Sequence, residues 1–148
     1  MVEDPTCPEP IESFRLRVVE SARKLKGTPF HHQGRVPKSG IDCIGMLVCV
    51  ALDLGIPHKD RVDYPRFPSA DDLIRGLEDA GLIRGSQIQT GSVIAFWIRH
   101  KDKPQHVGIK TEDRMIHTWY SVGKCVEHEF DSFWQERVHS VWEFPWQR

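Results

Sequence analysis

The most informative stretch of the chain reads Gly40-Ile41-Asp42-Cys43-Ile44-Gly45-Met46-Leu47. From this point apolar residues recur at intervals of three and four, at Cys43, Met46, Leu47, Val50 and Leu54. This period predicts a helix over residues 42–54 that Asp42 caps and Gly55 ends. A thiol in the first turn of a helix lies near unpaired backbone N–H groups, whose partial positive charge favours the thiolate. Cys43 is therefore a candidate nucleophile.

Two later histidines, His106 and His117, complete a candidate catalytic set with this thiol. They lie in apolar runs on either side of residues 111–114, which predict a hairpin turn. An even loop there pairs Lys110 with Met115, and this register puts both histidines on one face of the sheet as diagonal neighbours. The sequence thus permits a relay in which His106 takes the thiol proton and His117 orients His106.

The remaining patterns place helices early in the chain and strands later. Helical spacing predicts further helices over residues 11–26 and 71–80. Runs of β-branched and aromatic residues predict antiparallel strands over 92–98, 106–110, 115–119 and 138–144. Residues 28–40 and 58–68 are rich in turn formers and predict loops. This order predicts one α+β domain over residues 1–148, with N-terminal helices packed on a central antiparallel sheet and residues 1–10 as a mobile segment.

Composition bounds the classes of partner. The chain has 148 residues and a formal net charge of -1, which gives no overall electrostatic attraction to nucleic acid and leaves only a local basic patch open. No apolar run approaches the roughly 20 residues that span a bilayer, and the acidic, proline-rich start is unlike a secretory signal. The four cysteines show no disulfide-type spacing, so we expect reduced thiols. We expect a chain made in the cytoplasm, without nucleic-acid partners or membrane insertion.

Six motifs follow one another in the chain: Gly27-Thr28-Pro29-Phe30, His32-Gln33-Gly34-Arg35, Gly40-Ile41-Asp42-Cys43-Ile44-Gly45, Gly91-Ser92-Val93-Ile94-Ala95-Phe96, His106-Val107-Gly108-Ile109 and Ile116-His117. Together they resemble the NlpC family of papain-like cell-wall cysteine peptidases, and in particular its bacteriophage and gene-transfer-agent tail branch. The resemblance implies a papain-like NlpC-type domain in which Cys43 is the nucleophile, His106 the general base and His117 the orienting residue.

The same resemblance implies a reaction and its setting. The expected reaction is hydrolysis of an amide bond in peptidoglycan stem peptides, typically γ-D-glutamyl to diamino acid, through an acyl-enzyme on Cys43. No metal or organic cofactor is implied. The implied partners are the stem peptide and, from the phage branch, phage tail or gene-transfer-agent proteins. The enzyme would then act at the cell wall, carried on a virion tail.

The chain departs from the family pattern beside the expected nucleophile. The family commonly carries a tyrosine near Phe30, with its hydroxyl beside the catalytic cysteine, and phenylalanine has no hydroxyl. We assign Phe30, His31 and His32 to substrate binding, with either histidine replacing the missing polar contact.

Other functions fit parts of the pattern. A tail-tip assembly domain could keep the peptidase fold without its activity. Cys43, His106, His117 and Cys125 include zinc-type ligands, which would suit a metal-dependent hydrolase. A lipid acyltransferase of the related branch would place its histidine before its cysteine, which this chain does not. Four further histidines show no partner pattern and are expected in solvent: His58, His100, His128 and His139.

Overall fold

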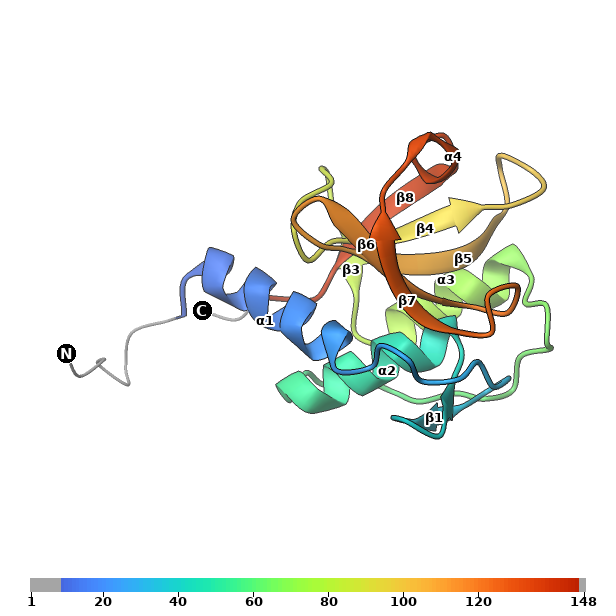
Figure 1. The fold of residues 1–148 in the computed structure, drawn as a ribbon, viewed down its shortest axis with the longest axis horizontal. Coiled ribbons are helices and arrows are strands. Elements are labelled where there is room, and N and C mark those ends of the chain that lie inside the picture. Colours follow the sequence, from blue (N-terminus) through green and yellow to red (C-terminus); the bar gives the residue numbers. More distant parts are fainter. Residues whose placement is uncertain (1–8, 147–148) are drawn as a thin grey trace.

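An antiparallel sheet carries the fold, and helices α1 and α2 lie together against one of its faces (Figure 1). The computed structural model describes residues 9–146. Residues 1–8 of the expected mobile segment, Cys7 among them, lie outside this range. Glu9 is described, and its carboxylate pairs with Arg17 on α1 at 2.7 Å.

Within residues 9–146 the sheet has six strands, each antiparallel to its neighbours. Their spatial order is β3 (Ile83–Arg84), β8 (Val138–Glu143), β4 (Val93–Trp97), β5 (Pro104–Lys110), β6 (Arg114–Trp119) and β7 (Lys124–Glu129). The helices are α1 (Ile11–Arg23), α2 (Cys43–Leu54), α3 (Ala70–Asp79) and the short α4 (Ser132–Gln135), and a ribbon of β1 (Arg35–Val36) and β2 (Gly40–Ile41) precedes α2. The predicted α+β architecture is confirmed.

The two faces of the sheet bury separate clusters of apolar side chains. Val18 of α1, Leu47 of α2 and Ile116 of β6 belong to the larger cluster on the helix side. The opposite face holds a smaller cluster around Phe96 and Trp134. Trp134 belongs to α4, which lies on the other side of the sheet from α1 and α2 (Figure 1). Because side chains of a strand alternate between faces, neighbouring residues of β5 and β6 point into different clusters.

The hairpin of β5 and β6 has the register expected from the sequence. Lys110 pairs with Met115 and Ile109 pairs with Ile116. The α2 helix begins at Cys43 and is closed by Gly55, whose φ of 70° is the left-handed conformation that glycine adopts without strain. Both predictions about the elements that carry the thiol and the two histidines are confirmed.

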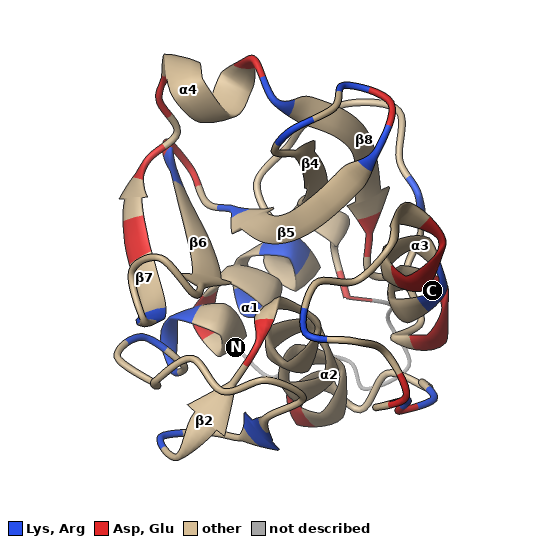
Figure 2. Ribbon diagram, turned by 90° about the vertical axis from the view of Figure 1, so that its right-hand side faces the viewer, with Lys and Arg blue, Asp and Glu red and all other residues tan. Residues whose placement is uncertain are grey.

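Charged residues of both signs are spread along the loops, and α3 carries acidic residues near both of its ends (Figure 2). Across residues 9–146, every helix is too short or too polar to cross a bilayer.

Candidate active site

Asp42 fixes the turn from which the thiol projects. One oxygen of its buried carboxylate accepts hydrogen bonds from the backbone N–H of Gly45 at 2.7 Å and from Arg35 at 3.1 Å. The other accepts from the backbone N–H of Gln33 at 2.9 Å and from the hydroxyl of Tyr64. A carboxylate is stable out of water only with partners of this kind. The first turn of α2 is therefore tied to two loops, and Cys43 is held in place.

Gly45 lets one of these loops come close to α2. A Cβ atom at this position would collide with the backbone carbonyl oxygen of Gly34. The residue after the thiol, Ile44, is accommodated in a similar way, because a Cβ on Gly76 of α3 would lie only 2.9 Å from the tip of its side chain. Glycines thus allow close packing at the two residues that follow Cys43.

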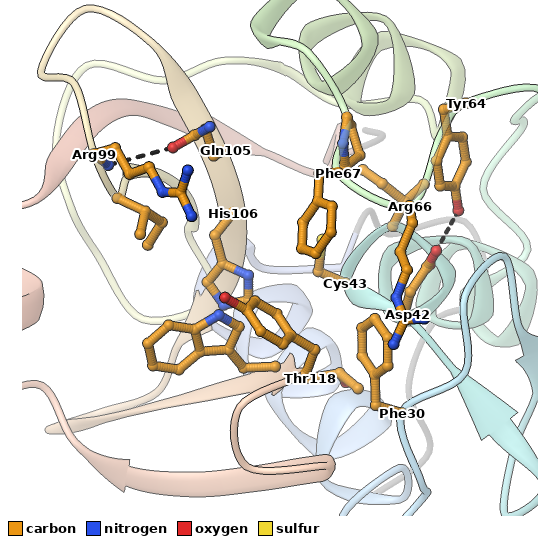
Figure 3. Close-up of a pocket in the computed structure, with 15 residues that line it drawn as sticks. Phe30, Asp42, Cys43, Tyr64, Arg66, Phe67, Arg99, Gln105, His106 and Thr118 are labelled. Atoms are coloured by element: carbon orange, nitrogen blue, oxygen red, sulfur yellow. Dashed lines mark hydrogen bonds between the residues drawn. The ribbon is translucent and has the colours of Figure 1, made fainter.

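Cys43 and His106 line one pocket of about 350 Å³. Figure 3 shows Cys43 entering it from the start of α2 and His106 from β5. Its walls are mostly apolar and aromatic, and its remaining lining residues are Phe30, Asp42, Ile44, Tyr64, Arg66, Phe67, Pro68, Ile98, Arg99, Gln105, Thr118, Trp119 and Tyr120. Phe67 and Tyr120 meet edge to face, with ring centroids 5.7 Å apart. The pocket is large enough for part of a peptide, with the sulfur in its wall.

Burial raises the pKa of the Cys43 thiol to about 12, and the negative charge of Asp42 acts in the same direction. Backbone N–H groups of Val107, Ile44 and Cys43 face the sulfur and lower the pKa, but by less. The helix start therefore favours the thiolate as expected, but burial and the charge of Asp42 outweigh it. The resting thiol is protonated at neutral pH, so it needs a base during the reaction.

The candidate base, His106, is the first member of a chain of hydrogen bonds. Nε2 of His106 lies 2.8 Å from Nδ1 of His117, as the predicted register requires. Nε2 of His117 in turn lies 2.7 Å from Nε2 of His128 on β7. Nδ1 of His128 bonds to the backbone carbonyl of Glu129 at 2.8 Å. We call this row of three imidazoles, one from each of β5, β6 and β7, the histidine relay.

Burial keeps His106 and His117 of the relay neutral. Burial and the neighbouring His117 keep the pKa of His106 well below its ordinary value of 6.5. Burial and His128 lower the pKa of His117 to about 3. The indole of Trp134 packs against all three imidazoles, with centroid distances of 5.6, 5.0 and 6.4 Å to His106, His117 and His128. A neutral imidazole has a free lone pair, so His106 can act as the proton acceptor, and its lowered pKa lets it give the proton up again.

His128 is a residue that sequence reasoning missed. The sequence predicts it in solvent, but it is half-buried and bonded to His117. The strand patterns leave residues 124–129 out, so nothing in them places His128 beside the other two. One signal is present in the sequence, because His106, His117 and His128 are evenly spaced. In successive hairpin strands this spacing places each histidine diagonally opposite the one before it.

The three residues assigned to substrate binding do not all lie at the pocket. Phe30 lines the pocket, whereas His31 and His32 do not. Nδ1 of His31 bonds to the carbonyl of His32, and the His32 ring packs edge-on against Tyr64. Neither histidine therefore lines the pocket with Cys43, and their part in substrate binding stays a prediction. A tyrosine hydroxyl reaches the site from Tyr64, which the sequence places in a surface loop.

The four residues considered as zinc ligands do not come together as one site. Among residues 9–146, no three side chains of His, Cys, Asp or Glu converge to hold a metal ion. Nε2 of His106 faces His117, and Cys125 is buried in the core on the helix side of the sheet. The idea that Cys125 joins these residues as a ligand is wrong.

Comparison with known proteins matches this arrangement to one family. The model of the NlpC/P60 family matches residues 27–143. The NlpC/P60 domain of the peptidoglycan hydrolase SagA is 26% identical with a TM-score of 0.54, over 81% of this chain and 92% of that one. A P60 domain from an antigen of M. avium subspecies paratuberculosis is 16% identical with a TM-score of 0.59, over 93% of this chain and 98% of that one.

A longer relative has the same fold. A lipoprotein-like NLP/P60 family protein of Staphylococcus aureus is 21% identical with a TM-score of 0.62, over 95% of this chain. The chain spans only 44% of the length of that protein. Among curated proteins, none matches the sequence.

Proposed function

Because the chain belongs to the NlpC/P60 family, we propose that it is a cysteine peptidase that hydrolyses an amide bond in peptidoglycan stem peptides. The observation that carries the proposal is a thiol at a helix start that shares a pocket with a neutral imidazole backed by a second imidazole. SagA, a relative in fold and sequence, is named as a peptidoglycan hydrolase.

The proposed first step is attack of the Cys43 sulfur on the amide carbonyl carbon. Since the thiol is protonated at rest, its proton passes to His106 as the carbon–sulfur bond forms. Nε2 of His106 is occupied by His117, so Nδ1 takes the proton. The oxyanion lies near the start of α2, where the backbone N–H of Cys43 can donate to it.

Collapse of this intermediate breaks the carbon–nitrogen bond, and His106 returns its proton to the leaving amine. The acyl group stays on Cys43 as a thioester. Water then attacks the thioester carbonyl while His106 takes one of its protons, which releases the carboxylate and regenerates the thiol. Every proton in this cycle moves through one nitrogen of His106.

The pocket suits an anionic peptide. Arg66 and Arg99 line it on either side of the thiol (Figure 3). A stem peptide carries carboxylates on its D-glutamyl and diamino acid residues, and guanidinium groups bind carboxylates through paired hydrogen bonds. We propose the γ-D-glutamyl to diamino acid bond as the one cleaved, with one arginine near each flanking carboxylate.

The direct test is digestion of purified peptidoglycan, followed by mass spectrometry of the released muropeptides. The wild-type protein should release fragments with a new amine on the diamino acid, and Cys43→Ala should release none while keeping its melting temperature. His106→Ala should be nearly as inactive, and His117→Ala should retain more activity than His106→Ala. Equal digestion by Cys43→Ala would refute the nucleophile, and an intact γ-D-glutamyl bond would refute the proposed substrate bond.

The setting of the reaction belongs to the proposal as well. The substrate places the enzyme at the cell wall. A phage or gene-transfer-agent tail as carrier rests on the resemblance in sequence alone and stays a prediction. A purely structural tail-tip role is the alternative that an inactive wild-type protein would favour.

A further inference from the structure

We infer that His128 is a positioning residue that sets which nitrogen of His106 carries a proton, and so keeps Nδ1 of His106 free for the thiol. The inference rests on the proposed function for its meaning, but its geometry stands by itself. Three hydrogen bonds carry it: His106 to His117, His117 to His128, and His128 to the backbone of Glu129.

The end of the relay farthest from the pocket sets the direction of its hydrogen bonds. A backbone carbonyl can only accept a hydrogen bond, so Nδ1 of His128 must carry a proton to bond to Glu129. If the ring carries only this proton, Nε2 of His128 is bare. The group facing that lone pair, Nε2 of His117, must be the donor. The tautomer of one imidazole is thus fixed by the bond its other nitrogen makes.

The same step repeats toward the pocket. Neutral His117 with its proton on Nε2 has a bare Nδ1, which accepts from Nε2 of His106. Neutral His106 with its proton on Nε2 has a bare Nδ1. In each of the three hydrogen bonds the donor therefore lies nearer the pocket than the acceptor. The lone pair with which His106 acts as a base is then on Nδ1, the nitrogen that does not bond to His117. Without the carbonyl of Glu129 and His128, nothing described in the relay would choose between the two directions.

The surroundings preserve this order. Trp134 packs against all three imidazoles and is 4% exposed. His106 and His117 are themselves buried, so water has little access to their ring nitrogens, where it would otherwise donate and accept hydrogen bonds. Gly108 lies beside the relay, where an added Cβ would come within 3.3 Å of the Cβ of His117. His117 is fully buried and has His128 as the partner of its outer nitrogen.

The test compares two variants of His128 that differ in one property. Glutamine offers a carbonyl that can accept from His117, and leucine fills similar space without an acceptor. His139→Leu is the matched control, because it removes an exposed imidazole of β8 whose Nδ1 bonds to the Ser140 hydroxyl next to it. Nitrogen-15 NMR of the imidazoles reports the tautomers, and peptide mapping reports the alkylation rate of Cys43 at neutral pH. Neither readout needs peptidoglycan.

In the wild type we expect protons on Nε2 of His106 and His117 and on Nδ1 of His128. His128→Leu should give mixed tautomers at His117 and His106 and slow alkylation by about 10-fold, whereas His128→Gln should stay within about 3-fold of the wild type. His139→Leu should change neither readout. A protein that cuts no muropeptide but shows this pattern would refute the proposed function and leave the relay standing.

Two results would overturn the inference. The first is a wild-type spectrum with the proton on Nδ1 of His106 or on Nε2 of His128, which needs no variant to fold. The second is a folded His128→Leu protein with unchanged tautomers and an unchanged alkylation rate, which would make His128 a packing residue.

Discussion

Asp42 fixes the position of Cys43 but disfavours the ionisation of its thiol. Its carboxylate holds the first turn of α2 through four hydrogen bonds, which places Cys43. The same negative charge raises the pKa of the adjacent thiol. Cys43 is therefore held in a fixed position but is not ionised in advance. His106 has to take the proton of the thiol during the reaction.

Removing the charge of Asp42 should separate the two effects. An asparagine at this position would still cap α2, because asparagine caps helices as well as aspartate does. Asp42→Asn should therefore lower the pKa of Cys43 from about 12 and speed its alkylation at neutral pH. The pH dependence of Cys43 alkylation, read by peptide mapping, measures the shift.

Asp60→Asn is the matched control, since Asp60 also pairs with Arg35 but is not among the groups that shift the Cys43 thiol. An unchanged or higher pKa of Cys43 in Asp42→Asn, with the control normal, would contradict the role given to the Asp42 charge.

At the scale of elements, α2 and the loop before β1 fit together only because residue 45 lacks a side chain. The carbonyl of Gly34 occupies the space of a Cβ there. Backbone cannot move aside as a flexible side chain can, so Gly45→Ala should destabilise the fold by about 1–3 kcal/mol. Urea unfolding followed by circular dichroism measures the loss.

Leu52→Ala is the control for an alanine on the same helix, because Leu52 is 70% exposed and touches little. It should change the free energy of unfolding by less than about 0.5 kcal/mol. Equal stability of Gly45→Ala and the wild type would show that the loop does not pack on α2 as described.

For the whole molecule, the relay makes stability depend on pH. In the unfolded chain His117 titrates at its ordinary pKa of 6.5, and in the folded protein its pKa is about 3. Between these values the unfolded state binds a proton that the folded state does not, so stability falls as pH falls from 6.5 toward 3. His106 acts in the same direction. The melting temperature should therefore drop between about pH 6.5 and 5, above the range where most carboxylates titrate.

His117→Gln removes one of these titrating groups and should flatten that part of the curve, while His139→Gln should leave it unchanged. A wild-type melting temperature that stays constant from about pH 6.5 to 5 would contradict the lowered pKa values of the buried His117 and His106.

Local patterns predict the parts of the site that local rules govern. The apolar period places α2, Asp42 is recognisable as its cap, and loop length sets the β5–β6 register that joins His106 to His117. The parts that depend on distant partners could not be predicted. In β7, Glu127 faces Arg23 and Lys26, and no strand pattern foretells an ion pair with residues at the other end of the chain. His128 was missed together with that strand.

Local sequence patterns also fail to predict the pKa of the Cys43 thiol. The helix start is visible in the sequence, and it favours ionisation. The burial of the thiol is not visible there, and burial has the larger effect on the pKa of Cys43. Tyr64 likewise falls in a predicted surface loop, yet it is 8% exposed because its hydroxyl bonds to Asp42.

The most direct test of the account is to mix the protein with a purified muropeptide, stop the reaction with acid within its first turnovers, and weigh the peptide that contains Cys43. We predict that this peptide carries the mass of the acyl portion of the substrate, and that the added mass disappears as product accumulates. A muropeptide that is cleaved while the Cys43 peptide stays unmodified at every time point would contradict covalent catalysis by this thiol.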